Sequence, residues 1–422
     1  MTNDAPGLWR HSGFLKLWAA QAVSGFGARI AREGLPMTAV LLLKAPPAAM
    51  GALAAIGLGA YAVGGLVAGR LADRLPGRAL LIAADLGRTA VMVAIPAAAL
   101  LHALTLPELA AAMALMSALT VIFDVADHAF LPRLVTRAQL IDGNAKLATT
   151  DSLAEVGGPA IAGGLFQLLS APIAVAPCAL TYLASALILA TIPPPRPQGG
   201  HAPAPRRAGP AAGVGIVLAH PLVRPIWLMA RAGDVFGWFF GALYLIYALD
   251  VLRLSPTMLG FTIAAGGVGA LIGASAAPAI NRRLGAGPSI VVSGLAMGLT
   301  TFLVPLAHGA PALAMALLVA AQLAGDALRT VMQIGQTSLR QAVLAPADLG
   351  RAAGAFATGQ GLAGVAGALI GGALGSWLGP RETLFLAAAG MTAAPLIGLA
   401  SPLWRAREAV QAAANSSAIE PN

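Results

Sequence analysis

Long apolar runs alternate with short polar or Gly/Pro-rich connections along this chain. Twelve of these runs are long enough to cross a membrane as α-helices, which needs about 20 predominantly apolar residues. They lie near residues 14–43, 48–72, 79–102, 107–130, 145–170, 173–192, 222–250, 256–280, 288–308, 311–336, 351–378 and 382–402. The pattern predicts an all-α polytopic membrane protein with twelve transmembrane helices.

A polar stretch separates the first six runs from the last six. The residues from Pro193 to Arg207 are rich in proline and carry charge, so they are expected to form an extended linker outside the lipid. We therefore expect an N-terminal six-helix bundle over 1–192, a cytoplasmic linker over 193–215, a C-terminal six-helix bundle over 216–404 and a cytoplasmic tail over 405–422.

The two halves match each other at a constant offset of 209 residues. The matched positions include residues of several types: His11 with His220, Trp18 with Trp227, Pro47 with Pro256, Arg74 with Arg283, Gly51 with Gly260, and Gly163 with Gly372. Because each half holds an even number of spans, both halves have the same orientation, as in transporters built from parallel repeats. The repeat predicts a substrate path between the halves near the membrane midplane.

The composition agrees with a membrane protein and excludes several other classes. Hydrophobic residues make up 58% of the chain and charged residues 10%, whereas soluble domains have about 25% charged residues. One cysteine, Cys178, and 6 scattered histidines exclude a disulfide scaffold and a thiolate metal cluster, so no cofactor or metal is expected. No clustered set of nucleophile, histidine and carboxylates indicates an enzyme.

The net charge of +9 is explained by membrane topology. Of the 26 Lys and Arg residues, 18 fall on the side of the termini, 5 fall inside spans, and 3 fall on the opposite side: Lys44, Arg253 and Arg381. The positive-inside rule then places both termini and the linker in the cytoplasm. We expect no nucleic-acid partner. The preference for Arg over Lys and the abundant Ala are typical of a GC-rich bacterial genome, which favours a bacterial inner (cytoplasmic) membrane.

The connection between the second and third spans carries a specific motif. It runs from Gly64 to Arg78 and contains Gly69-Arg70-Leu71-Ala72-Asp73-Arg74, followed by Pro76-Gly77-Arg78. This closely resembles the Gly-x-Leu-Ala-Asp-Arg-x-Gly-Arg loop of the major facilitator superfamily, with Pro76 inserted before Gly77. The resemblance implies two six-helix bundles that alternate in access, with Asp73, Arg74 and Arg78 acting as a cytoplasmic latch. Anchoring of the topology alone is the alternative.

Four charged residues on the next two spans are assigned to the same cytoplasmic gate. Asp85 and Arg88 share one helix face at i,i+3 spacing. Asp124 and Asp127 lie in the cytoplasmic third of the fourth span, where we expect them to pair with Arg74, Arg78 or Arg88.

The fifth span holds a second motif, Gly157-Gly158-Pro159-Ala160-Ile161-Ala162-Gly163-Gly164. A proline frees a backbone carbonyl in a spanning helix, and the glycines permit close helix crossing. The segment resembles the Gly-Pro-x-x-Gly-Gly signature of superfamily antiporters, with Ala162 in place of the first paired glycine. Its antiporter-like residues are Gly158, Pro159, Gly163 and Gly164. The resemblance implies export, and close helix packing without directional meaning is the alternative.

A third resemblance narrows the family. The stretch Phe123-Asp124-Val125-Ala126-Asp127-His128-Ala129-Phe130-Leu131-Pro132-Arg133, together with Leu17-Trp18-Ala19-Ala20-Gln21, is similar to the macrolide-efflux branch of drug:proton antiporters, with siderophore exporters nearby. The basic residue that many such exporters carry on the fourth span is missing, because residues 109–123 hold no charge.

Charged side chains inside the spans mark functional positions, since each costs at least about 2.5 kcal/mol at the bilayer centre. Glu33, Asp234 and Asp326 lie nearest mid-membrane and are the proton-coupling candidates. A carboxylate there can carry a proton when desolvation disfavours its charge, whereas a neighbouring arginine keeps it ionised. Static ion pairs are therefore the alternative, because arginines lie at helical spacing from each: Arg29 and Arg32 near Glu33, Arg231 near Asp234, and Arg329 near Asp326.

The seventh span holds a large share of the few aromatic residues. A stacking wall for an amphipathic substrate and simple helix packing both explain this. From this span and the membrane charges, we name four substrate-cavity candidates: Arg29, Trp238, Tyr244 and Arg329.

These features predict a secondary transporter that exports a small amphipathic compound, drug-like or siderophore-like, by proton antiport with rocker-switch alternating access. The expected partners are the small-molecule substrate, protons and the lipid bilayer, and the expected state is a monomer. The alternatives are a proton-independent or uptake facilitator of the same fold, and a lipid flippase.

Overall fold

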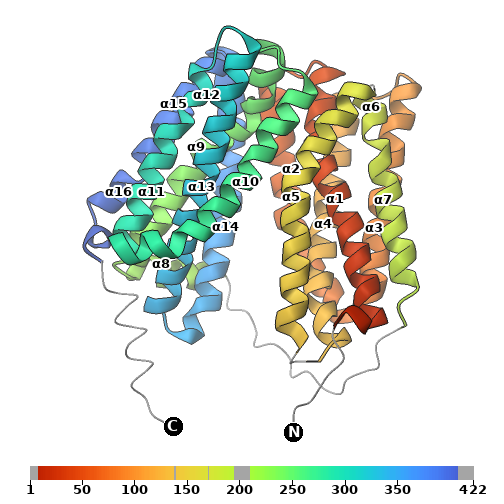
Figure 1. Ribbon diagram of the computed structural model, residues 1–422, viewed down its shortest axis with the longest axis horizontal. Helices are drawn as coiled ribbons and strands as arrows, with labels where there is room; N and C mark the ends of the chain where they lie inside the picture. Colours follow the sequence, from red (N-terminus) through yellow and green to blue (C-terminus); the bar gives the residue numbers. More distant parts are fainter. Residues whose placement is uncertain (1–7, 137–138, 170, 194–209, 407–422) are drawn as a thin grey trace. The chain divides into compact units, whose positions relative to one another are not determined.

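The computed structural model describes residues 8–136, 139–169, 171–193 and 210–406. Most of these residues are helical, and none of them forms a strand (Figure 1). The N-terminal set comprises α1 (Ser12–Leu41), α2 (Pro47–Arg74), α3 (Gly77–Leu100), α4 (Leu106–Leu134), α5 (Leu140–Leu168) and the pair α6 (Ala171–Ala174) and α7 (Ala176–Ala190). A 3-10 turn, Leu8–Arg10, precedes α1.

The C-terminal set has the same plan. It comprises α8 (Pro210–Ala219), α9 (Val223–Ile246) with a π-helical turn at Tyr247–Val251, α10 (Pro256–Leu284), α11 (Ala286–Thr301) with α12 (Leu303–Leu306), α13 (Pro311–Val343), α14 (Pro346–Trp377), and α15 (Pro380–Ala393) with α16 (Leu396–Leu399). A short 3-10 turn, Pro402–Arg405, ends the described chain. All twelve predicted runs are thus helical, so the all-α polytopic prediction is confirmed.

Prolines set many of the helix boundaries. The helices α2, α10, α13, α14 and α15 each begin with a proline, whose fixed φ suits the first helical position and whose missing N–H is not needed there. The breaks within the sixth, ninth and twelfth runs each lie within three residues of a proline, namely Pro177, Pro305 and Pro395. One boundary differs from the prediction, because α8 starts inside the expected 193–215 linker. Pro210 is the first residue of α8, a position that suits proline. The many prolines before it had favoured an extended linker over the whole range.

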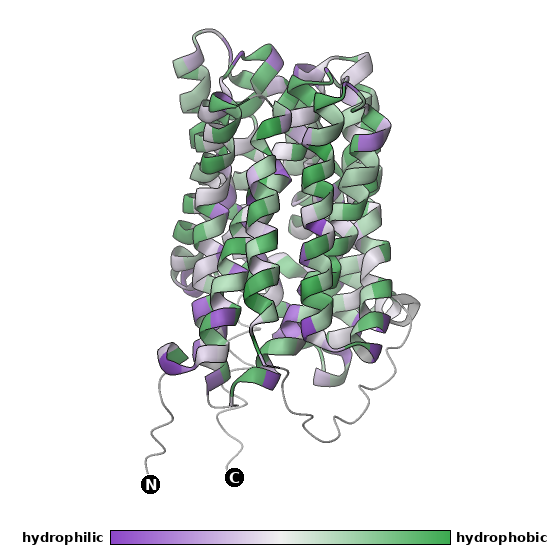
Figure 2. Ribbon diagram, turned by 90° about the vertical axis from the view of Figure 1, so that its right-hand side faces the viewer, coloured by the Kyte–Doolittle hydropathy of each residue, from purple (hydrophilic) through white to green (hydrophobic). Residues whose placement is uncertain are grey.

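The outer surfaces of the helices are apolar. Large hydrophobic side chains such as Leu66, Leu168 and Trp377 are 73%, 83% and 80% exposed. Figure 2 shows hydrophobic residues along most of the helices, with hydrophilic ones gathered toward the lower helix ends. Among the described residues, ten helices are long and apolar enough to cross a membrane, and α1 and α5 are not among the ten. Those two helices carry the densest set of membrane charges.

The chain forms two compact units. Unit 1 contains residues up to Pro46, Ile56–Ala202 and Ser255–Ala264, whereas unit 2 contains Pro47–Ala55, Pro203–Leu254 and the chain from Ala265 onward. In unit 1, α1 packs against α5 and α7, and α3 packs against α4 and α7. In unit 2, α9 packs against α14 and α15, and α11 packs against α13 and α15. The first residues of α10 therefore belong to unit 1, and the first residues of α2 belong to unit 2. The apolar pattern of the sequence did not indicate this exchange of helix starts.

Candidate functional site

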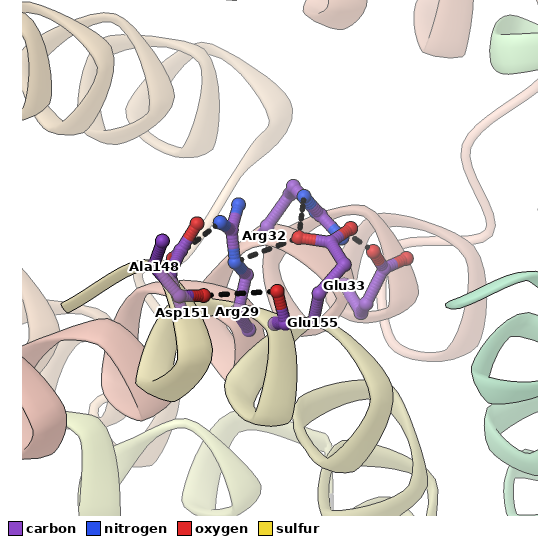
Figure 3. A network of polar contacts seen from close by, with 7 residues as sticks. Arg29, Arg32, Glu33, Ala148, Asp151 and Glu155 are labelled. Atoms are coloured by element: carbon purple, nitrogen blue, oxygen red, sulfur yellow. Dashed lines mark hydrogen bonds and ion pairs between the residues drawn. The ribbon is translucent and has the colours of Figure 1, made fainter. Parts of the chain in front are cut away.

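Five charged side chains of α1 and α5 form one connected network inside unit 1 (Figure 3). Arg29 Nη2 lies 2.7 Å from Asp151 Oδ1, and Arg29 Nε lies 2.8 Å from Glu155 Oε2. Arg32 Nη2 lies 2.7 Å from Glu155 Oε1, and Arg32 Nε lies 3.0 Å from Glu33 Oε1. Glu155 therefore bridges both guanidinium groups.

The network remains partly accessible. Asp151 is 64% exposed, Glu155 40% and Arg32 44%, whereas Glu33 is 13% exposed. Glu33 is thus the most enclosed acid of the network, and the α5 carboxylates are the ones that solutes reach most easily.

The glycines of the fifth span bring α5 and α1 together at this point. A Cβ on Gly158 would collide with the Cβ of Arg29, and one on Gly157 would lie 3.2 Å from the Phe26 ring. Pro159 has no amide hydrogen to donate to the carbonyl of Glu155, so the helical ladder is interrupted beside the network. The antiporter-like motif therefore forms one wall of the charged site.

The other glycines of the motif have different surroundings. Gly163 lies against the start of α10, where a Cβ would approach Gly260 and the Pro256 carbonyl oxygen. Nothing lies within 4 Å of a Cβ at Gly164. The motif thus contributes to two helix contacts of unit 1, and Gly164 contributes to neither.

A second polar cluster is buried within unit 1. Asp85 Oδ1 lies 3.1 Å from Arg88 Nη1 and accepts a hydrogen bond from Ser24 Oγ, also at 3.1 Å. The Arg88 guanidinium lies 4.5 Å from the centre of the Phe123 ring and 5.3 Å from that of Tyr182. Asp85 and Arg88 are 0% and 2% exposed, so this pair is enclosed by the core of the unit.

The other residues assigned to the cytoplasmic gate have varied contacts. Arg78 donates from Nε to the Leu189 carbonyl at 3.0 Å and from Nη2 to the Ala190 carbonyl, which are the last carbonyls of α7. Arg74 is exposed and has no ion pair with another described residue. The Asp73 side chain lies outside the described part of the structure.

The expected arginine pairing of the two fourth-span acids is wrong. Asp124 Oδ2 accepts from the Tyr61 hydroxyl at 3.2 Å, and Asp127 Oδ1 accepts from Gln21 Nε2. Arg88, one of the three expected partners, instead donates from its guanidinium to Asp85. The sequence placed these charges at one depth but could not show which helix faces meet.

In unit 2 the two remaining proton-coupling candidates are each paired. Asp234 Oδ2 lies 2.7 Å from Arg231 Nη2, and Asp326 Oδ1 lies 3.7 Å from Arg329 Nη1. Arg231 also donates from Nη1 to the Phe356 carbonyl of α14 at 2.5 Å. The i,i+3 spacing noted in the sequence is thus realised as two ion pairs.

The aromatic residues of α9 pack mainly inside unit 2. Tyr244 is 6% exposed and stacks on Phe240 with ring centres 5.3 Å apart. Phe239 packs on Gly371 of α14, and Phe236 packs on Gly390 of α15. Trp238 is half-buried and lies against Gly241. These contacts favour the packing interpretation over a substrate wall, and Tyr244 in particular is enclosed.

Comparisons with known proteins agree on the family. The chain resembles solved structures of a mutant form of the nucleoside transporter NupG (TM-score 0.77, 13% identity, 92% of this chain and 99% of that one) and of a bacterial homologue of the iron transporter ferroportin in an inward-facing state (0.71, 18%, 95% and 100%). It also resembles a bacterial homologue of the lysosomal transporter Spinster (0.72, 12%, 97% and 99%). A comparison with curated protein sequences finds no match. The model of the Major Facilitator Superfamily matches residues 17–338, and so the chain belongs to that superfamily of membrane transporters.

Proposed function

We propose that this transporter exports a small, amphipathic, positively charged compound from the cytoplasm of a bacterium, in exchange for protons. The protein would lie in the inner membrane with both termini in the cytoplasm, as the distribution of Lys and Arg favours. The similar structures carry the names of different substrates, so their shared fold gives no substrate for this chain.

The charge balance of the α1–α5 network carries the proposal. Two guanidinium groups face three carboxylates, which leaves one negative charge in excess when all five groups are ionised. An uncompensated charge among membrane helices is costly, so the network gains stability by taking up one positive charge. A proton and a monovalent organic cation both meet that need. Competition of the two for one excess charge is the basis of antiport.

The pairs of unit 2 lack this imbalance. Arg231 with Asp234, and Arg329 with Asp326, each sum to zero. Protonation of either acid would leave the two arginines with a single carboxylate between them, an excess of positive charge that disfavours uptake of a proton. We therefore assign coupling to the network that contains Glu33, and treat Asp234 and Asp326 as members of structural ion pairs.

We keep the cytoplasmic gate as part of the proposal and give its residues three different roles. Asp73 and Arg74 would form the latch that the loop motif implies, together with Arg78. Asp85 and Arg88 would hold unit 1 together during the movement, because their pair is enclosed within it. Asp124 and Asp127 would change their hydrogen bonds, to Tyr61 and to Gln21 respectively, when the latch opens or closes.

The test is transport by purified protein in liposomes with an imposed pH gradient and an internal pH dye. Cationic dyes, macrolides and siderophores are offered in turn. We expect a cationic substrate to evoke proton flux, and Glu33→Gln to abolish that flux because the network then holds two acids for two arginines. Asp234→Asn and Asp326→Asn should retain flux if their pairs are structural.

Asp348→Asn is the matched control. Asp348 pairs with Arg351 at i,i+3 in unit 2, as Asp326 does with Arg329, but it lies in the first turn of α14. Full flux in this variant shows that loss of an acid alone is harmless. Substrate equilibration that ignores the pH gradient in every variant would contradict antiport and indicate a facilitator. Movement of labelled phospholipid between leaflets without flux of any offered compound would indicate a flippase.

A further inference from the structure

An open pocket of about 300 Å³ lies at one end of unit 2, at the lower limit of the roughly 300–1,000 Å³ typical of small-ligand sites. Four segments meet there: the π-helical turn that ends α9, the loop before α10, the loop between α12 and α13, and the start of α15. Its polar lining comes from Tyr247, Arg253, His308 and Arg381, and its apolar lining includes Val251 and Leu252.

The basic residues in this pocket are unusual for their location. This is the end of the unit where only Arg253 and Arg381 carry positive charge, and it is predicted to face away from the cytoplasm. Both of them line the same pocket. The acidic residues next to them in the sequence, Asp250 and Glu382, are not lining residues, and the Glu382 carboxylate lies against Gly379 at the start of α15. The residues that line the pocket therefore include two arginines and no acid.

The donors of the pocket are positioned by the surrounding backbone. Arg381 donates from Nε to the Pro305 carbonyl at 2.9 Å, and within the described residues its two terminal amino groups have no hydrogen-bond partner. Tyr247 donates to the Ala307 carbonyl at 2.7 Å. His308 Nδ1 lies 2.7 Å from the Leu306 carbonyl oxygen, and the His308 side chain is exposed at the pocket.

The backbone of Arg253 adopts the left-handed conformation, with φ +56°. A side chain in that region costs about 1–2 kcal/mol, and glycine usually occupies it. Arg253 has no hydrogen bond or ion pair with any described residue. The left-handed conformation ends the helix, as it does at Lys44 and His102, and it leaves the unpaired guanidinium of Arg253 at the pocket, next to a π-helical turn of the kind often found at functional sites.

The internal repeat supplies a natural comparison in unit 1. Lys44 stands 209 residues before Arg253, with φ +50°, and its turn has the matching hydrogen bonds: Ala45 to Ala39 and Leu254 to Ala248, both 3.0 Å. However, Thr38 occupies the position of Tyr247, and Pro172 occupies that of Arg381. Unit 1 therefore repeats the turn and one basic residue but lacks the second arginine and the tyrosine.

We propose that the pocket of unit 2 binds a phosphate-type oxyanion between Arg253 and Arg381. Two guanidinium groups suit the several acceptor oxygens of a phosphate. The apolar part of the lining and the position at the helix ends fit a phospholipid headgroup, and a soluble phosphate ester shares the same chemistry. The proposal is independent of the direction of transport and of the transported compound.

The test uses the purified full-length protein in detergent, with phosphatidylglycerol and inorganic phosphate as separate probes. Native mass spectrometry measures retained lipid, and the thermal unfolding temperature measures the effect of phosphate. We expect the wild type to retain the lipid, and Arg253→Gln to reduce its occupancy about tenfold, which is the loss expected for one hydrogen bond to a charged group. Arg381→Gln should reduce it similarly, and Lys44→Gln should leave it unchanged.

The outcomes separate the two sources of the oxyanion. Lipid retention that Arg253→Gln removes, without an effect of phosphate, identifies the headgroup. Stabilisation by phosphate that Arg253→Gln removes, without lipid retention, identifies a soluble oxyanion. Equal behaviour of the wild type and Arg253→Gln toward both probes overturns the proposal. Since Arg253 has no described partner to lose, its variant should fold, and an unchanged unfolding temperature without probes verifies this.

Discussion

The backbone of Gly158 lies directly against the Cβ of Arg29. This contact joins the antiporter-like motif of α5 to the charged face of α1, and it sets the distance at which Arg29 reaches Asp151 and Glu155. A motif that the sequence associates with export is therefore also the means by which the charged network is assembled.

The variant Gly158→Ala should separate α5 from α1. Its new Cβ would overlap Arg29, and overpacking of this kind costs typically about 1–3 kcal/mol. We expect a lower unfolding temperature and substrate-evoked proton flux reduced at least about tenfold in liposomes, because the ion pairs of Arg29 are displaced.

Gly164→Ala is the control for this prediction. The residue lies on the same helix, but its new Cβ meets nothing within 4 Å. Since alanine favours the helix over glycine by roughly 1 kcal/mol, this variant should be as stable as the wild type or more stable. Equal flux in the two alanine variants would show that the contact with Arg29 does not position the network.

The repeat predicts a pair of equivalent glycine contacts, one in each unit. Gly260 lies against Gly163 and the Pro159 carbonyl in unit 1, and Gly51 lies against Gly372 and the Ala368 carbonyl in unit 2. Each pair maps onto the other through the offset of 209 residues. We expect Gly51→Ala and Gly260→Ala to lower the unfolding temperature by similar amounts, since both place a Cβ against a backbone carbonyl.

Gly59→Ala tests the specificity of that effect. Gly59 also lies on α2, where nothing is within 4 Å of its Cβ, so its replacement should not destabilise the protein. A strong effect at only one of Gly51 and Gly260 would show that the two contacts differ in energy despite their matching geometry.

Arg78 has a measurable role besides the latch. It hydrogen-bonds the last two carbonyls of α7, of which that of Leu189 also accepts from the Ile192 amide, and its charge favours the negative end of the helix. Arg78→Gln should therefore lower the unfolding temperature, and Arg78→Lys should retain part of the stability. A variant with wild-type stability and defective transport would instead assign Arg78 to the latch alone.

The extent to which sequence predicted the structure depends on the range of the interaction. The helices of the apolar runs and the i,i+3 pairs Arg231–Asp234 and Asp326–Arg329 follow from local spacing, and the structure has them. Glu33 was expected to have Arg29 and Arg32 as neighbours on its own helix, and Arg32 is the one that it contacts.

The partners on other helices were not predictable in this way. Nothing in the spacing of α1 indicates that Arg29 contacts Asp151 and Glu155, because that depends on the rotation of two helices about their axes. The same limit explains the wrong pairing of Asp124 and the missed convergence of Arg253 with Arg381. The αL conformation of Arg253 left no signal either, since arginine is not the residue type that predicts it.

The buried pair of Asp85 and Arg88 gives the most direct test of what holds unit 1 together. Removing one partner of a buried ion pair leaves the other charge uncompensated, at a typical cost of about 3–5 kcal/mol. Arg88→Met keeps much of the side-chain volume between Phe123 and Tyr182 but leaves Asp85 unpaired. We therefore expect Arg88→Met to lower the unfolding temperature sharply in detergent.

The double variant Asp85→Asn with Arg88→Met should recover much of that loss, because no uncompensated charge is then buried. If the pair acts as a gate instead, the single and double variants should be equally defective in transport while the double variant is stable. Recovery of both stability and flux in the double variant would show that these charges are dispensable for gating. The comparison thus separates a pair that stabilises one unit from a pair that closes the transport path, using two substitutions in contact with each other.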